Sequence, residues 1–97
     1  MSYGYNAIMN FAWDPAKAAS NLQRHRVSFE EARCVFDDPL AVNFVDEEHS
    51  GKGAREFMIG HSNQNRLLIV CFTERPGGIR LISARRATRL ERQDYEN

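Results

Sequence analysis

The stretch Arg66-Leu-Leu-Ile-Val-Cys-Phe-Thr73, followed by Pro76-Gly-Gly78 and Ile79-Arg-Leu-Ile-Ser83, decides the fold of this chain. Its first part is apolar at successive positions, which is typical of a central strand buried on both faces. Pro-Gly-Gly is a turn sequence, because proline fixes the backbone at the first turn position and glycine accepts a left-handed conformation. We therefore expect the two apolar stretches to pair as an antiparallel hairpin.

Three further strands are predicted around this hairpin. Residues 55–61 form one of them, and the turn sequence Asn63-Gln-Asn65 joins it to residues 66–73. Residues 40–45 form another strand, and residues 10–13 form a short one near the N-terminal end. Because the last four strands follow one another through short connections, we expect them to pair antiparallel.

Three helices complete the expected fold. Asp14-Pro15 supplies an N-cap and a first-turn proline for a helix that runs to about residue 24. The capping box Ser28-Phe-Glu-Glu31 starts a second helix, and a last helix is expected from about residue 84 to 95. The order β-α-α-β-β-β-β-α predicts an α+β domain, in which an antiparallel sheet packs with two N-terminal helices and one C-terminal helix.

Length and composition limit the class of protein. The 97 residues have room for one domain, and we expect residues 1–9 to be a ragged leader. Hydrophobic residues make up 42% of the chain, which excludes intrinsic disorder, and the longest apolar stretch (67–72) is too short to cross a membrane. Cys34 and Cys71 lack the spacing of metal ligands. We therefore expect reduced thiols, no metal site and a cytoplasmic location.

A net charge of zero hides a polarised distribution of charge. Residues 1–50 carry 4 basic and 8 acidic side chains, whereas residues 51–97 carry 9 basic and 5 acidic ones. Eleven of the 13 cations are arginines, which favour planar, bidentate contacts with phosphate or carboxylate. The second half of the chain therefore predicts a partner that carries such groups.

The cations considered for phosphate contact are Arg55, Arg66, Arg80, Arg85, Arg86, Arg89 and Arg92. On the expected last helix, Arg85, Arg89 and Arg92 share one face, and Arg86 lies beside them. Within that helix only Arg92 and Glu96 have the spacing of an ion pair, so most of this charge lacks a local partner. The alternative interpretation is a solvated helix face without a binding role.

Three other residues have both a functional and a structural interpretation. Arg80 lies on a strand, where it either contributes to catalysis or forms an ion pair with Glu74 or Glu56. His25 lies on the apolar side of the first helix and is either a general acid or base or a structural histidine. Trp13 either stacks on a nucleic-acid base or anchors the core.

Several short motifs, taken together and in order over residues 10–96, resemble those of the BrnT family of type II toxins. They are Phe11-Ala-Trp-Asp-Pro-Ala-Lys17, Asn21, His25, Val27-Ser-Phe-Glu-Glu-Ala32, Val35-Phe-Asp-Asp-Pro-Leu40, His49-Ser50 and Ile79-Arg-Leu-Ile-Ser-Ala-Arg85. The chain departs from the family in two places. Arg26 stands where the family usually has glycine, and Gly53-Ala54 stand where an acidic pair usually precedes Arg55.

The resemblance implies a RelE-like fold and a ribonuclease that needs no metal or other cofactor and arrests translation by cutting RNA. It also implies a BrnA-type antitoxin, which binds DNA and represses its own operon together with the toxin. The family's recurrent positions fall at Trp13, Lys17, His25, Arg55, Arg66, Arg80 and Arg85.

In the resulting hypothesis, the ribose 2′-hydroxyl attacks the adjacent phosphate, so the nucleophile belongs to the RNA. Arg80 and Arg85 stabilise the charge of the transition state with help from Arg55 or Arg66, and His25 carries a proton. The expected RNA-binding residues are Trp13, Lys17, Arg66, Arg86, Arg89 and Arg92. Two alternatives remain open: a non-catalytic RNA-binding module, and a decayed toxin that mainly binds its antitoxin.

Overall fold

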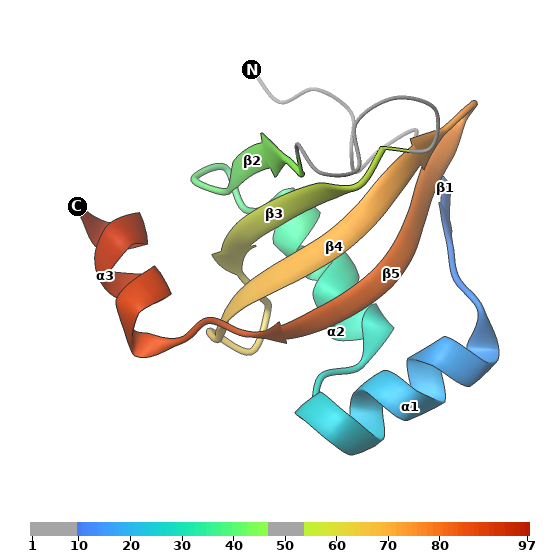
Figure 1. The fold of residues 1–97 in the computed structure, drawn as a ribbon, viewed down its shortest axis with the longest axis horizontal. Helices are drawn as coiled ribbons and strands as arrows, with labels where there is room; N and C mark the ends of the chain where they lie inside the picture. The colour runs from blue at the N-terminus through green and yellow to red at the C-terminus, as the bar shows by residue number, and fades with distance from the viewer. Residues whose placement is uncertain (1–9, 47–53) are drawn as a thin grey trace.

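The computed structural model describes residues 10–46 and 54–97, and a five-stranded sheet lies at its centre (Figure 1). The strands are β1 (Asn10–Ala12), β2 (Val42–Val45), β3 (Glu56–His61), β4 (Leu67–Arg75) and β5 (Gly78–Arg86). The helices are α1 (Pro15–His25), α2 (Phe29–Cys34), the 3-10 turn η1 (Val35–Asp37) and α3 (Arg89–Glu96). The expected leader (1–9) and the motif His49-Ser50 lie outside the described residues.

Strand β4 is central, as its apolar sequence predicts. The strand order is β1-β5-β4-β3-β2, and β4 is buried on both faces from Leu67 to Thr73. On one face, Leu68, Val70 and Phe72 pack in the main core with α2, and on the other Leu67 and Ile69 form a second, smaller cluster. The unbroken apolar run of β4 is therefore explained by burial on two sides.

The sheet is mixed, which corrects the expectation of a purely antiparallel one. Strands β2 to β5 pair antiparallel, but β1 pairs parallel with β5, with Phe11 opposite Ile79. The prediction from short turns applied only to the last four strands. β1 is the first strand of the chain and pairs with β5, the last one, so no short turn connects the pair. The pairing requires glycine at position 78, because a Cβ there would lie 2.4 Å from the carbonyl oxygen of Asn10.

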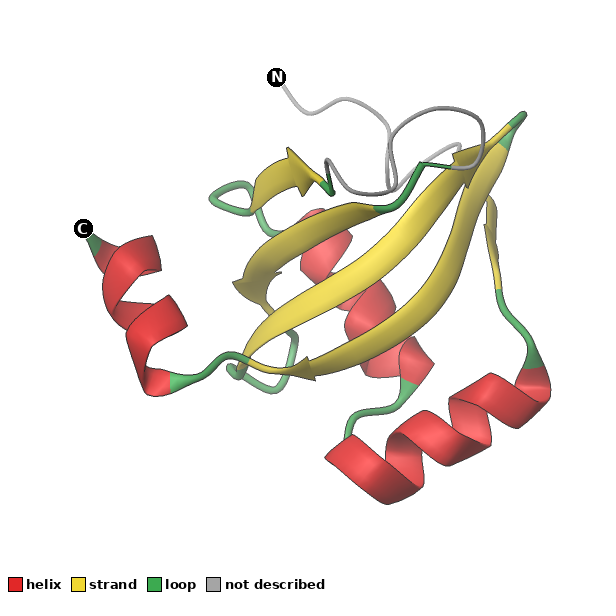
Figure 2. Ribbon diagram, viewed as in Figure 1, coloured by secondary structure: helices red, strands yellow, loops and turns green. Residues whose placement is uncertain are grey.

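The helices are distributed unevenly around the sheet (Figures 1 and 2). Helix α2 covers one face, where Phe29 and Ala32 are buried, and α1 lies along the β5 side of the sheet. Helix α3 lies at the other end of the sheet and buries none of its residues. None of these described helices has the length and apolar character that a membrane span requires.

The last helix begins at residue 89, and the expected start at residue 84 was wrong. Residues 83–86 instead continue β5, since they pair with residues 68–71 of the apolar strand β4. Thr88 caps α3 through a capping box with Glu91, a local sequence signal that identifies the correct start. Consequently Arg85 and Arg86 are strand residues, and they do not share a helix face with Arg89 and Arg92.

Candidate active site

The face of the sheet opposite α2 gathers several of the predicted site residues. This outer face carries Arg80, Ser83 and Arg85 from β5, which lie opposite Thr73, Cys71 and Ile69 of β4. A register shift at Cys71 and Phe72 leaves Ile82 as an extra residue in β5, so that Arg80 and Arg85 both reach this face despite their odd spacing. The bulge therefore brings two arginines of one strand to the same surface.

Arg85 is fixed by a bidentate ion pair with Glu91 of α3. Its Nη1 and Nη2 donate to the two carboxylate oxygens of Glu91, each at 2.8 Å, and Nη1 also reaches the carbonyl of Arg86 at 3.2 Å. Glu91 in turn accepts from the backbone N–H of Thr88 at 2.8 Å. The hydrogen bonds from Arg85 lower the pKa of Glu91 to about 2. The Nε–H of Arg85 donates to no described residue, so this donor is left without a partner in the described part of the chain.

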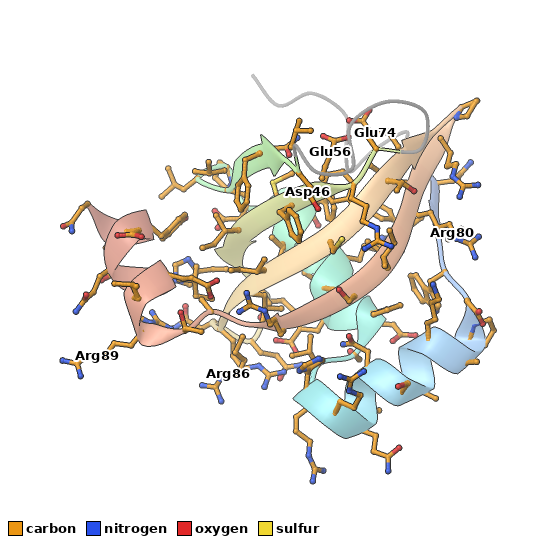
Figure 3. All side chains as sticks on the ribbon, in the orientation of Figure 1. Asp46, Glu56, Glu74, Arg80, Arg86 and Arg89 are labelled. Atoms are coloured by element: carbon orange, nitrogen blue, oxygen red, sulfur yellow. The ribbon has the colours of Figure 1, made fainter. Side chains whose placement is uncertain are left out.

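Arg80 lies at the other end of the same face, next to β1 (Figure 3). It forms neither of the expected ion pairs with Glu56 or Glu74. Glu56 accepts instead from Asn43 at 3.1 Å, and its hydrogen bond with Glu74 raises the pKa of the Glu74 carboxyl. Directly opposite Arg80, the buried hydroxyl of Thr73 has no hydrogen-bond partner. Arg80 and Thr73 thus offer polar groups that the described part of the chain does not satisfy.

Arg55 approaches the outer face from the β3 side. It precedes β3 and is exposed, and its carbonyl accepts from the backbone N–H of Asp46 at 3.0 Å. The charges of Arg55 and Asp46 both reach the buried thiol of Cys71, whose pKa burial raises. Arg55 therefore lies across the face from the β5 arginines, but it precedes β3 instead of starting the strand as expected.

His25 and Lys17 meet β5 from a different side. Together with Ser20, Arg24 and residues 82–83 of β5, they line a hollow of about 240 Å³ between α1 and the edge of the sheet. Ser83 belongs both to this hollow and to the outer face, so it connects the two regions. The hollow therefore brings His25 and Lys17 together.

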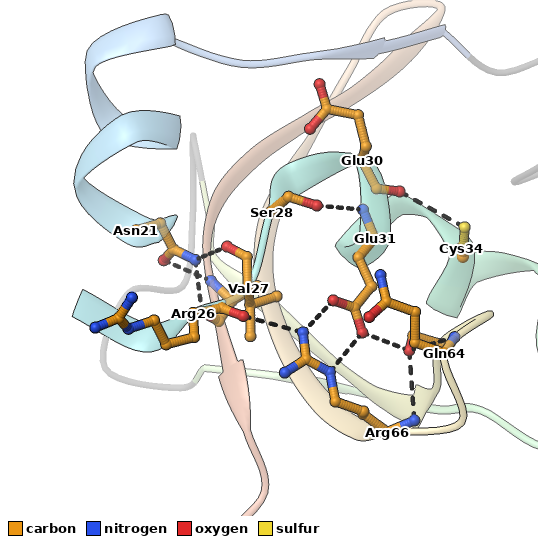
Figure 4. A network of polar contacts seen from close by, with 11 residues as sticks. Asn21, Arg26, Val27, Ser28, Glu30, Glu31, Cys34, Gln64 and Arg66 are labelled. Carbon is orange, nitrogen blue, oxygen red and sulfur yellow. Dashed lines mark hydrogen bonds and ion pairs between the residues drawn. The ribbon is translucent and has the colours of Figure 1, made fainter. Parts of the chain in front are cut away.

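Arg66 forms a structural contact, whereas its expected role in RNA binding stays a prediction (Figure 4). Its guanidinium binds both carboxylate oxygens of the buried Glu31, with Nε at 2.9 Å, and donates to the carbonyl of Arg26 at 3.0 Å. Ser62 also donates to Glu31, at 2.6 Å. The hydrogen bond from Arg66 lowers the pKa of Glu31. Glu31 is therefore more than a first-turn residue of α2: it is the anion of a network that joins α2 to the start of β4.

The remaining expected RNA-binding residues are scattered. Trp13 packs edge-on against Phe29 with ring centroids 5.8 Å apart, the core-anchor arrangement rather than an open stacking platform. Arg86 points to the α2 side of the sheet, because it pairs with Leu68 of the main core. Arg89 and Arg92 are exposed on α3, and Arg92 forms the expected ion pair with Glu96 at 3.8 Å.

Comparison with known proteins identifies the family of this chain and supports its fold. A family model described as "Ribonuclease toxin, BrnT, of type II toxin-antitoxin system" matches residues 13–91, which is most of the chain. The chain belongs to the BrnT family. A search of curated proteins found no match. Among solved structures, the chain is similar to the crystal structure of the Brucella abortus ribonuclease toxin, BrnT. The TM-score is 0.65 at 24% identity, with 84% of this chain and 99% of that chain covered, which shows the same fold.

As a BrnT toxin, this chain is a member of a ribonuclease family whose toxins pair with an antitoxin. Sequence reasoning gave Asn21 no structural role and did not single out Glu91, although these residues hold the β5 strand and its arginine. Thr88-x-x-Glu91 is a capping-box pattern and signals the position of Glu91, whereas no local pattern signals its contact with Arg85. Within residues 10–46 and 54–97, no group of three or more His, Cys, Asp or Glu residues is placed to hold a metal ion.

Proposed function

We propose that this BrnT toxin is an endoribonuclease that cuts RNA through the RNA's own 2′-hydroxyl, without a metal ion. The observation that carries the proposal is the arrangement of Arg85. Glu91 holds its two terminal nitrogens, and its Nε–H has no hydrogen-bond partner among the described residues. A guanidinium that is fixed before the substrate arrives can stabilise charge as it develops in the transition state.

In this mechanism the 2′-oxygen attacks the adjacent phosphorus, and the bond from phosphorus to the 5′-oxygen breaks. The products are a 2′,3′-cyclic phosphate and a 5′-hydroxyl. His25 takes the proton of the 2′-hydroxyl, and water protonates the leaving 5′-oxygen. Arg85 contacts the phosphate oxygens that gain charge, and loss of one such donor typically slows catalysis by roughly 10²–10³-fold.

We assign Arg80 to a second phosphate of the RNA rather than to the reacting one. Arg80 and Arg85 are five residues apart along β5, which corresponds to roughly 15 Å at the rise of a strand. Two side chains that far apart are better placed for two separate phosphates of one RNA strand than for a single phosphate. Arg55 and Lys17 then contact the RNA backbone on either side of β5.

We further propose that the antitoxin of this toxin is of the BrnA type and that the pair acts in the cytoplasm. The support is the motif resemblance over residues 10–96 together with membership in a type II toxin family. A BrnA-type partner is expected to bind DNA and to repress the operon together with the toxin. Co-expression of the two genes with an operator–reporter fusion tests this expectation: repression should need the antitoxin and increase when the toxin is present.

The cleavage mechanism is tested by incubating purified toxin with RNA in EDTA and mapping the RNA ends. We expect 2′,3′-cyclic phosphate ends that disappear in Arg85→Ala and decrease in Arg80→Ala. Arg33→Ala is the matched control, since Arg33 lies over the Phe11 ring, 5.1 Å from its centroid, away from the outer face. Intact RNA with all proteins would support a non-catalytic binding module, and full activity of Arg85→Ala would remove Arg85 from the mechanism.

A further inference from the structure

An apolar groove of about 310 Å³ lies on the outer face between α3 and strands β2 to β4. Val42, Phe44 and Ile69 form its apolar floor, while Glu91, Asp94 and Tyr95 form the wall on α3. These three wall residues are spaced i, i+3 and i+4, so they share one face of the helix. The groove has a lining different from that of the arginine-bearing part of the same face.

The groove leaves large apolar side chains exposed to solvent. Val42 is 51% exposed and Phe44 is 46% exposed. Strand β2 is an edge strand whose residues are all exposed. The groove is also a built feature, because the Tyr95 hydroxyl donates to the carbonyl of Leu40 at 3.0 Å and ties α3 to the β2 side. Contiguous exposed apolar surface of this kind marks a site of protein interaction.

The charges of the wall restrict what can occupy the groove. Asp94 forms no ion pair or hydrogen bond with another described side chain, and Glu91 already holds Arg85. The carboxylate of Asp94, unlike that of Glu91, has no paired cation among the described residues, so it disfavours the phosphates of RNA in the groove. A second copy of the chain, related by a two-fold axis, would place the same acidic wall near itself. The occupant with complementary chemistry is a protein segment with apolar side chains and a lysine or arginine that pairs with Asp94.

We propose that the groove between α3 and β2 is the docking surface for the toxin's antitoxin, which inserts an apolar segment that carries a basic side chain. The proposal rests on the type II partnership of the proposed function, and it does not depend on the cleavage chemistry. A segment in the groove touches Glu91, whose carboxylate is 2.8 Å from Arg85. Docking there places the antitoxin directly beside the candidate catalytic arginine and closes that part of the outer face to RNA.

The test measures the affinity of purified toxin variants for the antitoxin encoded in the same operon, by calorimetry. Phe44→Glu places a charge in the apolar floor, and we expect it to weaken binding by about tenfold or more. The matched control is Leu22→Glu, because Leu22 is 49% exposed on α1, away from the groove. Asp94→Lys should weaken binding as well, and a reversed charge at one basic residue of the antitoxin should restore the affinity.

Cleavage of RNA by the free variants and their thermal unfolding are measured in parallel. We expect both to stay near wild type for Phe44→Glu and Asp94→Lys, so that the loss of antitoxin binding is specific. Unchanged affinity in both variants would overturn the proposal. A loss of RNA affinity in these variants would also overturn the proposal, because it would assign the groove to RNA. A loss of toxin self-association would overturn it as well, because it would assign the groove to a second copy of the chain. Because binding is measured directly, the result stands even if the toxin cuts no RNA in the assay.

Discussion

The side-chain amide of Asn21 hydrogen-bonds both backbone groups of Ala84. Its Oδ1 accepts from the Ala84 N–H at 3.0 Å, and its Nδ2 donates to the Ala84 carbonyl at 2.8 Å and to the Val27 carbonyl at 2.9 Å. Strand β1 ends opposite Arg80, so the β5 edge beyond it has no neighbouring strand. The amide of Asn21 serves there as a single peptide unit of the missing strand, and it fixes the backbone that carries Arg85.

We therefore expect Asn21→Ala to lower the free energy of unfolding by about 2–3 kcal/mol, because it leaves buried backbone groups of Ala84 unpaired. Urea unfolding followed by circular dichroism measures the change. The control is Gln23→Ala, an exposed position of the same helix, which should stay close to wild type. Equal stability of the two variants would show that water replaces the amide without cost.

Arg26 occupies the left-handed region, with φ of 59°, at the C-terminal end of α1. This is the position where the family usually has glycine, and a side chain there is strained. We expect Arg26→Gly to raise the free energy of unfolding by about 0.5–1 kcal/mol, since glycine relieves the strain but gains freedom in the unfolded chain. Arg24→Gly, within the helix, should instead destabilise. If both variants destabilise, strain at Arg26 is not the dominant effect.

Sequence periodicity predicted the framework because its signals are local. The apolar run of β4, the turn at Pro76-Gly77 and the caps Asp14 and Ser28 each specify backbone within a few residues, and all are found in the structure. The placement of Arg80 on a strand face followed from the same reasoning. These local signals are enough to predict the strands that form the outer face, without knowledge of contacts between distant parts of the chain.

The partners of the charged residues could not be predicted in this way. Arg66 contacts Glu31 across 35 positions of sequence, and Asn21 contacts Ala84 across 63. Such contacts depend on how the helices and strands pack against one another, and the spacing of residues along the sequence does not reveal this packing. The error at residue 84 has a related cause: Ala84-Arg85-Arg86 has good intrinsic helix propensity, but pairing with the apolar β4 strand overrides it.

The contact between Arg66 and Glu31 gives a prediction that distinguishes a structural role of Arg66 from a role in RNA binding. Arg66→Ala leaves the buried Glu31 carboxylate unpaired, so we expect the free energy of unfolding to fall by about 3–5 kcal/mol. Arg66→Met combined with Glu31→Leu removes both charges and should recover much of that loss. If Arg66 is structural, the double variant should also cut RNA at nearly the wild-type rate. A stable double variant without RNA affinity would restore Arg66 to the RNA-binding surface.

Acid should weaken the contact between Arg85 and Glu91 within a defined pH range. The pKa of Glu91 is lowered to about 2 in the folded protein, below the usual carboxyl value of 4.5. A lowered pKa means that the unfolded state takes up the proton first, so this stabilisation is complete above about pH 5 and is lost as the pH falls toward 2. We expect the difference in unfolding free energy between wild type and Glu91→Gln to be constant near neutral pH and to shrink over that range.

Taking the difference removes the parallel effect of Glu31, whose pKa is also lowered and which is present in both proteins. A difference that stays constant down to about pH 2.5 would show that the ion pair contributes nothing to stability, and that Glu91 holds Arg85 in place without strengthening the fold.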